Sequence, residues 1–134
     1  MTTYYPLDEA MQVRPPGGVR ADVRALVDLY PERRIAFMEA GCPSGRDNGS
    51  NRGTQRHFVR RLFQAWDAFD QIEFVLLNWL HDIPAEELAG FLDYYGSDDL
   101  AFASFLGTLG LRTESGVDKP AFIQLRRETA KRGW

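Results

Sequence analysis

An apolar stripe runs along residues 55–81 and constrains the fold of this 134-residue chain more than any other feature. Large apolar residues recur there at steps of three and four positions: Phe58, Leu62, Trp66, Phe69, Ile72, Leu76 and Leu80. This spacing is typical of an amphipathic helix, because residues three and four positions apart share one face. We expect a long helical region that is broken near residues 68–70, where Asp70 and Glu73 have the spacing of a capping box. Its second half, residues 72–80, is apolar almost all round and is predicted to be the central buried helix.

The rest of the chain carries the start and stop signals of further short helices. Prolines suit first helical turns and glycines follow last turns, which predicts helices at 20–30, 31–41, 84–95, 97–109 and from Pro120 onward. No segment gives a convincing strand pattern. The predicted fold is therefore all-α, a single compact bundle of six or seven short helices.

Two stretches rich in proline and glycine bound this bundle. Residues 1–19 are expected to form an extended N-terminal arm, and residues 20–134 the helical bundle domain. Within that domain, residues 41–54 contain four glycines and are expected to form a mobile loop.

Composition narrows the class of protein further. A chain of 134 residues with 44% hydrophobic residues is long enough for one domain with its own core. Cys42 is the only cysteine, which excludes an internal disulfide and suits a reducing compartment. The N-terminus lacks the features of a signal peptide, and the apolar run at 74–80 is far shorter than the roughly 20 residues that span a bilayer. We expect a cytoplasmic protein with no membrane partner.

Charge is sorted along the chain although the formal net charge is only −3. Residues 1–61 contain ten arginines and seven acidic residues, and residues 112–134 contain six basic and three acidic residues. Residues 62–111 contain nine acidic residues and no lysine or arginine. Surfaces of opposite sign on one small domain favour association between copies or with a charged partner.

Two sets of charged residues are the candidate partner-binding sites. The basic set is Arg52, Arg56, Arg60 and Arg61. At helical spacing these arginines form adjacent rows that can bind carboxylates or phosphate. The acidic set is Asp82, Glu86, Glu87, Asp98 and Asp99. The alternative interpretation of both sets is an ordinary solvated surface.

The predicted function is a non-enzymatic, adaptor-like module that binds a protein partner or a second copy of itself through these two faces. One alternative is a small nucleic-acid-binding regulator that uses Arg52 to Arg61 or the basic residues Arg126 to Arg132. Another alternative is a phage- or plasmid-encoded inhibitor of a host protein.

The sequence gives no motif for catalysis, a metal or a cofactor. Cys42, His57 and His81 would form a catalytic group only if the fold brought them together. The glycine loop lacks the P-loop pattern, and the acidic tract contains no EF-hand loop. We therefore expect no enzyme, no metal and no cofactor.

Residues 20–82 resemble the small death-like adaptor domains of bacterial defence and signalling proteins, called effector-associated domains. The resemblance lies in Leu26-Val-Asp-Leu-Tyr-Pro31, the segment Arg33 to Gly41, the glycine loop, and Phe58-Val-Arg-Arg-Leu62 leading on to residues 72–80. It implies a compact helical bundle that assembles through complementary charged faces, and it carries over no catalytic residue.

Overall fold

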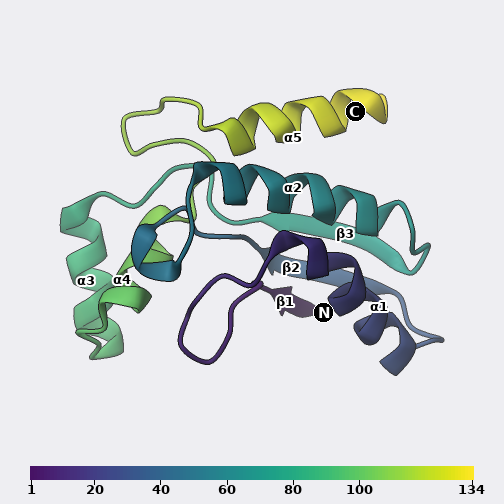
Figure 1. Ribbon diagram of the computed structural model, residues 1–134, viewed down its shortest axis with the longest axis horizontal. Helices are drawn as coiled ribbons and strands as arrows, with labels where there is room; N and C mark the ends of the chain where they lie inside the picture. The colour runs from purple at the N-terminus through teal and green to yellow at the C-terminus, as the bar shows by residue number, and fades with distance from the viewer.

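The structure, a computed structural model that describes residues 1–134, is an α/β fold and overturns the all-α prediction (Figure 1). The strands are β1 (Thr2–Tyr4), β2 (Ile35–Ala40) and β3 (Ile72–Leu77). The α-helices are α1 (Val19–Leu29), α2 (Arg52–Trp66), α3 (Ala85–Tyr95), α4 (Leu100–Thr108) and α5 (Pro120–Lys131). Two 3-10 helices, η1 (Pro16–Gly18) and η2 (Arg46–Asn48), lie in the connections.

Two of the predicted helices are strands. The segment predicted as a helix at 31–41 forms β2, and the predicted central buried helix at 72–80 forms β3. Strands of a parallel sheet often read as nearly continuous apolar runs without alternation, and residues 74–77 of β3 form such a run although one face of this sheet is exposed. Such a short run cannot be distinguished from a buried helix by periodicity alone, which is why the expectation was wrong.

The long apolar stripe is therefore divided between a helix and a strand. Its first half is α2, which begins after Asn51, whose side chain accepts hydrogen bonds from the backbone of Gly53 (2.8 Å) and Thr54 (2.9 Å). Asp70 and Glu73 form no capping box, since Glu73 lies in β3 and pairs with Arg34. The chain reverses between the two halves instead of breaking a helix.

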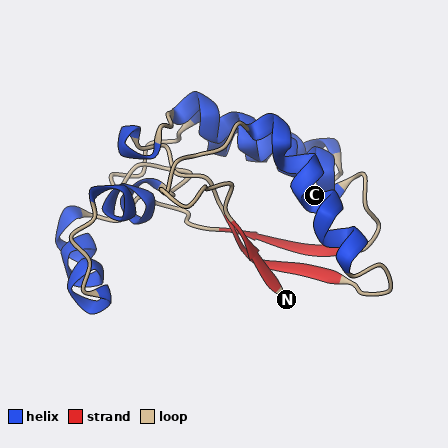
Figure 2. Ribbon diagram, turned by 60° about the horizontal axis from the view of Figure 1, so that its bottom comes forward, coloured by secondary structure: helices blue, strands red, loops and turns tan.

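The three strands form one parallel sheet in the order β1-β2-β3. Helix α1 connects β1 to β2, and α2 connects β2 to β3. Figure 2 shows the helices that cover the sheet on one of its faces, with the α3–α4 pair beyond its end. Sequential parallel strands with their helices on one face are the arrangement of consecutive units in a (β/α) barrel, whereas doubly wound sheets carry helices on both faces.

The core lies between the sheet and the helices α1 and α2. It is a cluster of 16 buried residues, which includes Val23 of α1, Phe37 of β2 and Phe58 of α2. Helix α5 packs along α2 and adds Ala121 to the same cluster. The core therefore joins β/α units that are far apart in the sequence.

The opposite face of the sheet is open. Side chains alternate between the faces of a strand, and Phe37 and Val75 pack on the core side. Their neighbours Met38, Phe74 and Leu76 therefore point away from the helices, and they remain 42%, 45% and 40% exposed. All-parallel sheets are normally covered on both faces, so this face is unusual for a sheet of this type.

The helices α3 and α4 form a hairpin that projects from the body (Figure 1). Both were expected from the sequence at nearly these bounds, and the structure confirms them, as it confirms α1 and α5. No residue of α3 or α4 is buried. None of the helices is long and apolar enough to cross a membrane.

The arm and the glycine loop expected from the sequence both contact the body. Within residues 1–19, β1 joins the sheet and η1 precedes α1. In the glycine loop, the Asn48 side chain donates hydrogen bonds to the carbonyl oxygens of Met11 (2.9 Å) and Ala101 (2.8 Å). The expected mobility of residues 41–54 stays a prediction.

Candidate functional site

Polar side chains gather where the three strands end. Tyr5 follows β1, Glu39 is the penultimate residue of β2, and Asn78 follows β3. Because the strands are parallel, their carboxyl ends meet at one edge of the sheet, which is where α/β proteins of this type bind ligands. We call Tyr5, Glu39 and Asn78 the carboxyl-edge cluster.

Hydrogen bonds connect the three members of this cluster. The Tyr5 hydroxyl donates to Glu39 Oε2 over 2.9 Å, and the Asn78 amide nitrogen Nδ2 donates to the Tyr5 hydroxyl over 3.4 Å. The Asn78 backbone N–H donates to the carbonyl of Ala40 over 2.9 Å, which fixes the end of β3 beside the end of β2. The Tyr5 ring contacts Phe105 of α4 edge-on, with the ring centroids 5.1 Å apart.

The Tyr5 hydroxyl stays protonated and acts as a hydrogen-bond donor. Burial raises the pKa of Tyr5 well above its ordinary value, and the hydrogen bond to Glu39 raises it further, because an ionised phenol would repel the carboxylate. The hydroxyl therefore remains a donor at all physiological pH values. The Glu39 carboxylate is exposed, and only its Oε2 atom accepts this hydrogen bond. Its other oxygen, Oε1, has no partner within the chain.

A pocket lies next to this edge, in the segment that follows β3. Its volume is about 450 Å³. Its lining combines apolar and titratable side chains: Trp79, Leu80, His81, Asp82, Ile83, Pro84, Glu87, Phe91 and Glu114. An aromatic and acidic lining of this kind suits a ligand with polar groups and an apolar face.

This fold occurs in solved glycosidase structures. A β-glucuronidase from Ruminococcus gnavus in complex with uronic deoxynojirimycin is similar over 94% of this chain, with a TM-score of 0.61 and 12% sequence identity. The same organism's β-glucuronidase in complex with uronic isofagomine is similar over 84% of this chain, with a TM-score of 0.54 and 12% identity. The matched regions are 22% and 18% of those chains, so this chain spans about a fifth of their length. No protein-family model and no curated protein matches the chain.

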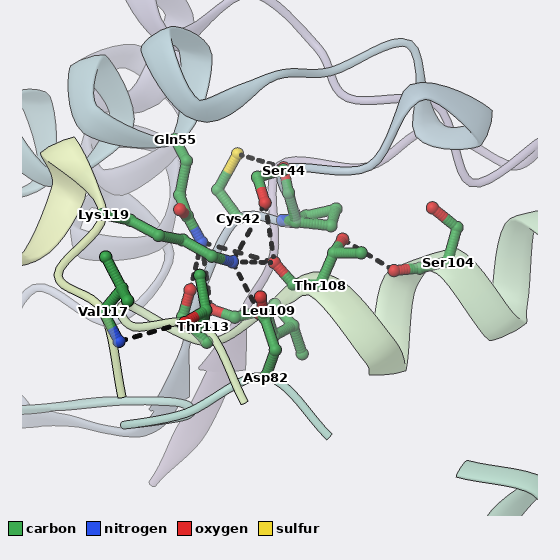
Figure 3. A network of polar contacts seen from close by, with 12 residues as sticks. Cys42, Ser44, Gln55, Asp82, Ser104, Thr108, Leu109, Thr113, Val117 and Lys119 are labelled. Carbon is green, nitrogen blue, oxygen red and sulfur yellow. Dashed lines mark hydrogen bonds and ion pairs between the residues drawn. The ribbon is translucent and has the colours of Figure 1, made fainter. Parts of the chain in front are cut away.

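A buried ion pair supports the segment that carries the pocket (Figure 3). Lys119 is 1% exposed, and its ammonium group donates to Asp82 Oδ1 over 2.5 Å, to Ser44 Oγ over 3.1 Å and to the Thr108 carbonyl over 3.3 Å. Burial lowers the pKa of Lys119 and raises that of Asp82, while the hydrogen bond between the two opposes both shifts. This one side chain joins the loops after β2 and β3 to the end of α4 and the start of α5.

A glutamine and a glycine complete this junction. The Gln55 side chain of α2 donates to the carbonyl oxygens of Leu109 and Gly110, both over 3.0 Å. A Cβ atom at Gly110 would collide with the backbone of His81 and Asp82, so only glycine fits there. The segment after α4 is therefore packed closely against both α2 and the segment that follows β3.

The arginines that the sequence analysis selected lie together on α2. Arg52, Arg56, Arg60 and Arg61 are all exposed, and none forms an ion pair. Helix α5 packs along α2, and Arg56 and Arg60 line a groove of about 500 Å³ between the two helices, whereas Arg52 and Arg61 lie outside its lining. We call this the α2/α5 groove. Its lining is entirely polar: Arg56, Arg60, Gln64, Asp67, Gln124, Arg127, Glu128, Lys131 and Arg132.

The acidic candidates are divided between two places. Asp82 pairs with Lys119 inside the junction and is no part of an acidic face. Glu86 and Glu87 lie in the first turn of α3, and Asp98 and Asp99 lie directly before α4, all four exposed. Asp99 also caps α4, since its carboxylate accepts from the Ala101 N–H over 2.8 Å.

The three catalytic candidates from the sequence form no common site. Cys42 is buried, and burial raises the pKa of its thiol to about 12. His57 is an exposed residue of α2 that accepts a hydrogen bond from Arg61. His81 lines the pocket after β3. No hydrogen bond connects any two of the three residues.

The carboxyl-edge cluster is the part of the site that sequence reasoning missed. Its signal is present: Glu39 and Asn78 stand at the ends of the two apolar runs that form β2 and β3. That signal identifies a site only after both runs are recognised as strands. Since both were predicted as helices, neither residue was selected.

Proposed function

We propose that the carboxyl edge of the sheet binds a glycoside and that Glu39 is one of the two carboxylates of a glycoside-cleaving site. The observation that carries this proposal is the hydrogen bond from Tyr5 to Glu39 across two adjacent strand ends. A second support is that the neighbouring solved structures with this fold are β-glucuronidases. The aromatic and acidic pocket beside the cluster is a third.

Each member of the cluster has a separate role in this proposal. Glu39 presents its free oxygen to the sugar, either as the nucleophile or as the base that activates water. Tyr5 is a positioning residue that holds the other oxygen, and Asn78 in turn orients the Tyr5 hydroxyl. Glycoside cleavage uses a pair of carboxylates. We propose that further β/α units beyond the three strands of this chain supply the second one.

A cationic sugar analogue tests this proposal without requiring turnover. Uronic isofagomine carries a basic ring nitrogen, so its ammonium form should pair with the Glu39 carboxylate. In titrations followed by amide NMR, the ligand should shift the signals of Tyr5, Glu39 and Trp79. Glu39→Gln should weaken binding at least about tenfold, because a hydrogen bond to a charged group contributes about 1.5–3 kcal/mol.

Two further variants sharpen the test. Tyr5→Phe should weaken binding by less than Glu39→Gln, because it misplaces the carboxylate without removing it. Glu73→Gln, a matched change of an exposed acid in β3, should leave the affinity unchanged. Equal affinities of the wild type and Glu39→Gln would refute the proposal.

The adaptor-like interaction module predicted from the sequence remains a second candidate function. It is favoured by a different observation, the row of α2 arginines that have no acidic partner in their own chain. The alternative of a phage- or plasmid-encoded inhibitor stays a prediction that no contact in the structure favours.

A further inference from the structure

We propose that the α2/α5 groove binds the acidic α3–α4 hairpin of a second copy of this chain. This inference is independent of the glycoside proposal, because the groove and the carboxyl-edge cluster share no residue. It rests on the unpaired charge of two surfaces that lie in separate parts of the molecule (Figure 1).

The groove has an excess of positive charge that its own acids do not neutralise. Of its five basic residues, Lys131 and Arg132 pair with Glu128, over 3.2 Å and 3.1 Å, and Arg132 also pairs with Asp67. The remaining three have no acidic partner: Arg56, Arg60 and Arg127.

The guanidinium groups of these three arginines have N–H donors available for a carboxylate. Arg56 donates only its Nε–H, to Gln124 over 3.3 Å, so its two terminal nitrogens remain available. Arg60 and Arg127 form no side-chain hydrogen bond. Guanidinium groups with this freedom bind carboxylates in pairs of parallel hydrogen bonds.

The hairpin is the complementary surface. Residues 85–108 contain no lysine or arginine, and their acids are all exposed and outside every ion pair: Glu86, Glu87, Asp93, Asp98 and Asp99. Three of them surround the tip between α3 and α4. The same tip exposes Tyr94 by 81% and Tyr95 by 58%.

Tyrosine next to acid is a suitable partner for an arginine groove. Arginine stacks on aromatic rings as well as binding carboxylates, so one guanidinium can use both features of the tip. A single exposed ion pair contributes little, so the contact depends on several pairs and on burial of the tyrosines. The hairpin lies away from the groove of its own copy, at the other end of the molecule (Figure 1). The contact therefore joins one copy to the next.

Reciprocal charge reversal tests whether these two surfaces meet. The groove variant is Arg56→Glu, Arg60→Glu and Arg127→Glu, and the hairpin variant is Asp93→Lys and Asp98→Lys. Light scattering after gel filtration should give an oligomer for the wild type at about 10 mM salt, where the Debye length is about 30 Å, and a monomer at about 1 M salt, where it is about 3 Å. Each variant alone should be monomeric at both salt concentrations, with unchanged circular dichroism.

Mixing the two variants is the decisive step. The wild-type groove of one faces the wild-type hairpin of the other, and the two reversed surfaces also match, so association should return. A control variant with the same charge change elsewhere is Arg20→Glu, Arg33→Glu and Arg46→Glu, and it should associate like the wild type. A mixture that stays monomeric would overturn the proposal, as would a monomeric wild type at low salt. A wild type that is monomeric and binds a single-stranded oligonucleotide through Arg56 and Arg60 would assign the groove to nucleic acid instead.

Discussion

The body of the molecule and the α3–α4 hairpin are ordered by different interactions. The body has a core of 16 buried residues between the sheet and its helices, whereas no residue of α3 or α4 is buried. The hairpin has aromatic contacts of its own, such as the edge-on contact of Tyr95 with Phe102, whose ring centroids are 5.5 Å apart. Its second helix also contacts the body, through Ala101 and Phe105. We therefore expect the body to contribute most of the free energy of unfolding, while the exposed surface of the hairpin is available for contacts with other molecules.

Removal of one aromatic ring from each region should show the largest difference. Phe58→Ala removes a fully buried ring from α2 and should lower the free energy of unfolding by about 3–5 kcal/mol. Phe102→Ala removes a half-buried ring from α4 and should cost about 1 kcal/mol or less. Urea denaturation of both variants measures the two losses. Similar losses would mean that the hairpin is an integral part of the core.

The ion pair that joins the two regions should have a smaller effect than Phe58. Lys119→Met leaves Asp82 without its partner at a largely buried position and should destabilise the protein by about 3 kcal/mol. The double variant with Asp82→Leu should recover part of that loss, because no uncompensated charge then remains. Lys131→Met is a suitable control, since Lys131 is 65% exposed and a change there should stay within about 0.5 kcal/mol. A double variant less stable than Lys119→Met would contradict the charge-compensation argument.

A pH dependence specific to the body should be the smallest of the three effects. Burial alone would raise the pKa of Glu128, but hydrogen bonds from Arg132, Lys131 and Gln124 lower it below its ordinary value of 4.5. A carboxylate with a lowered folded-state pKa stabilises the protein above its unfolded-state pKa, and that contribution is lost as the pH falls through the folded-state value.

Glu128→Gln should therefore destabilise the protein at neutral pH, and the difference from the wild type should shrink below about pH 4.5. Denaturation curves across this range provide the measurement. The matched hairpin variant Glu86→Gln removes an acid that has no ion pair, and it should cost only about 0.5 kcal/mol, from the loss of a negative charge in the first turn of α3. A constant difference between the wild type and Glu128→Gln down to pH 3 would show that the ion pairs of Glu128 contribute no stability.

The parts of the fold that sequence reasoning predicted are those with signals of their own. Helix α3 begins directly after Pro84 and α5 begins at Pro120, and proline at these positions marks a helix start regardless of the surroundings. Helix α4 was expected from residue 97 and begins after Asp99. The strands β2 and β3 have no such marker, because parallel strands acquire their identity from neighbours distant in sequence. Ile35 meets Ile72 only after the whole of α2 has folded back on the sheet.

The candidate sites differ in the same way. The arginines of α2 are visible in the sequence because one helix places them, and only their meeting with the α5 residues required the structure. The carboxyl-edge cluster has one residue at the end of each of three strands, and Tyr5 and Glu39 are 34 positions apart. No local pattern connects such residues, so the sequence does not identify them as a cluster until the order of the strands is known.

The sequential order of the strands also determines how a protein of this type can change in size. Each unit pairs only with the units before and after it, so β1 and β3 are both free edges. A duplicated β/α unit can join either edge without separating strands that already pair. Recombination of whole units therefore preserves every existing ladder of hydrogen bonds, and genes for such sheets can lengthen or exchange segments in steps of one strand and one helix.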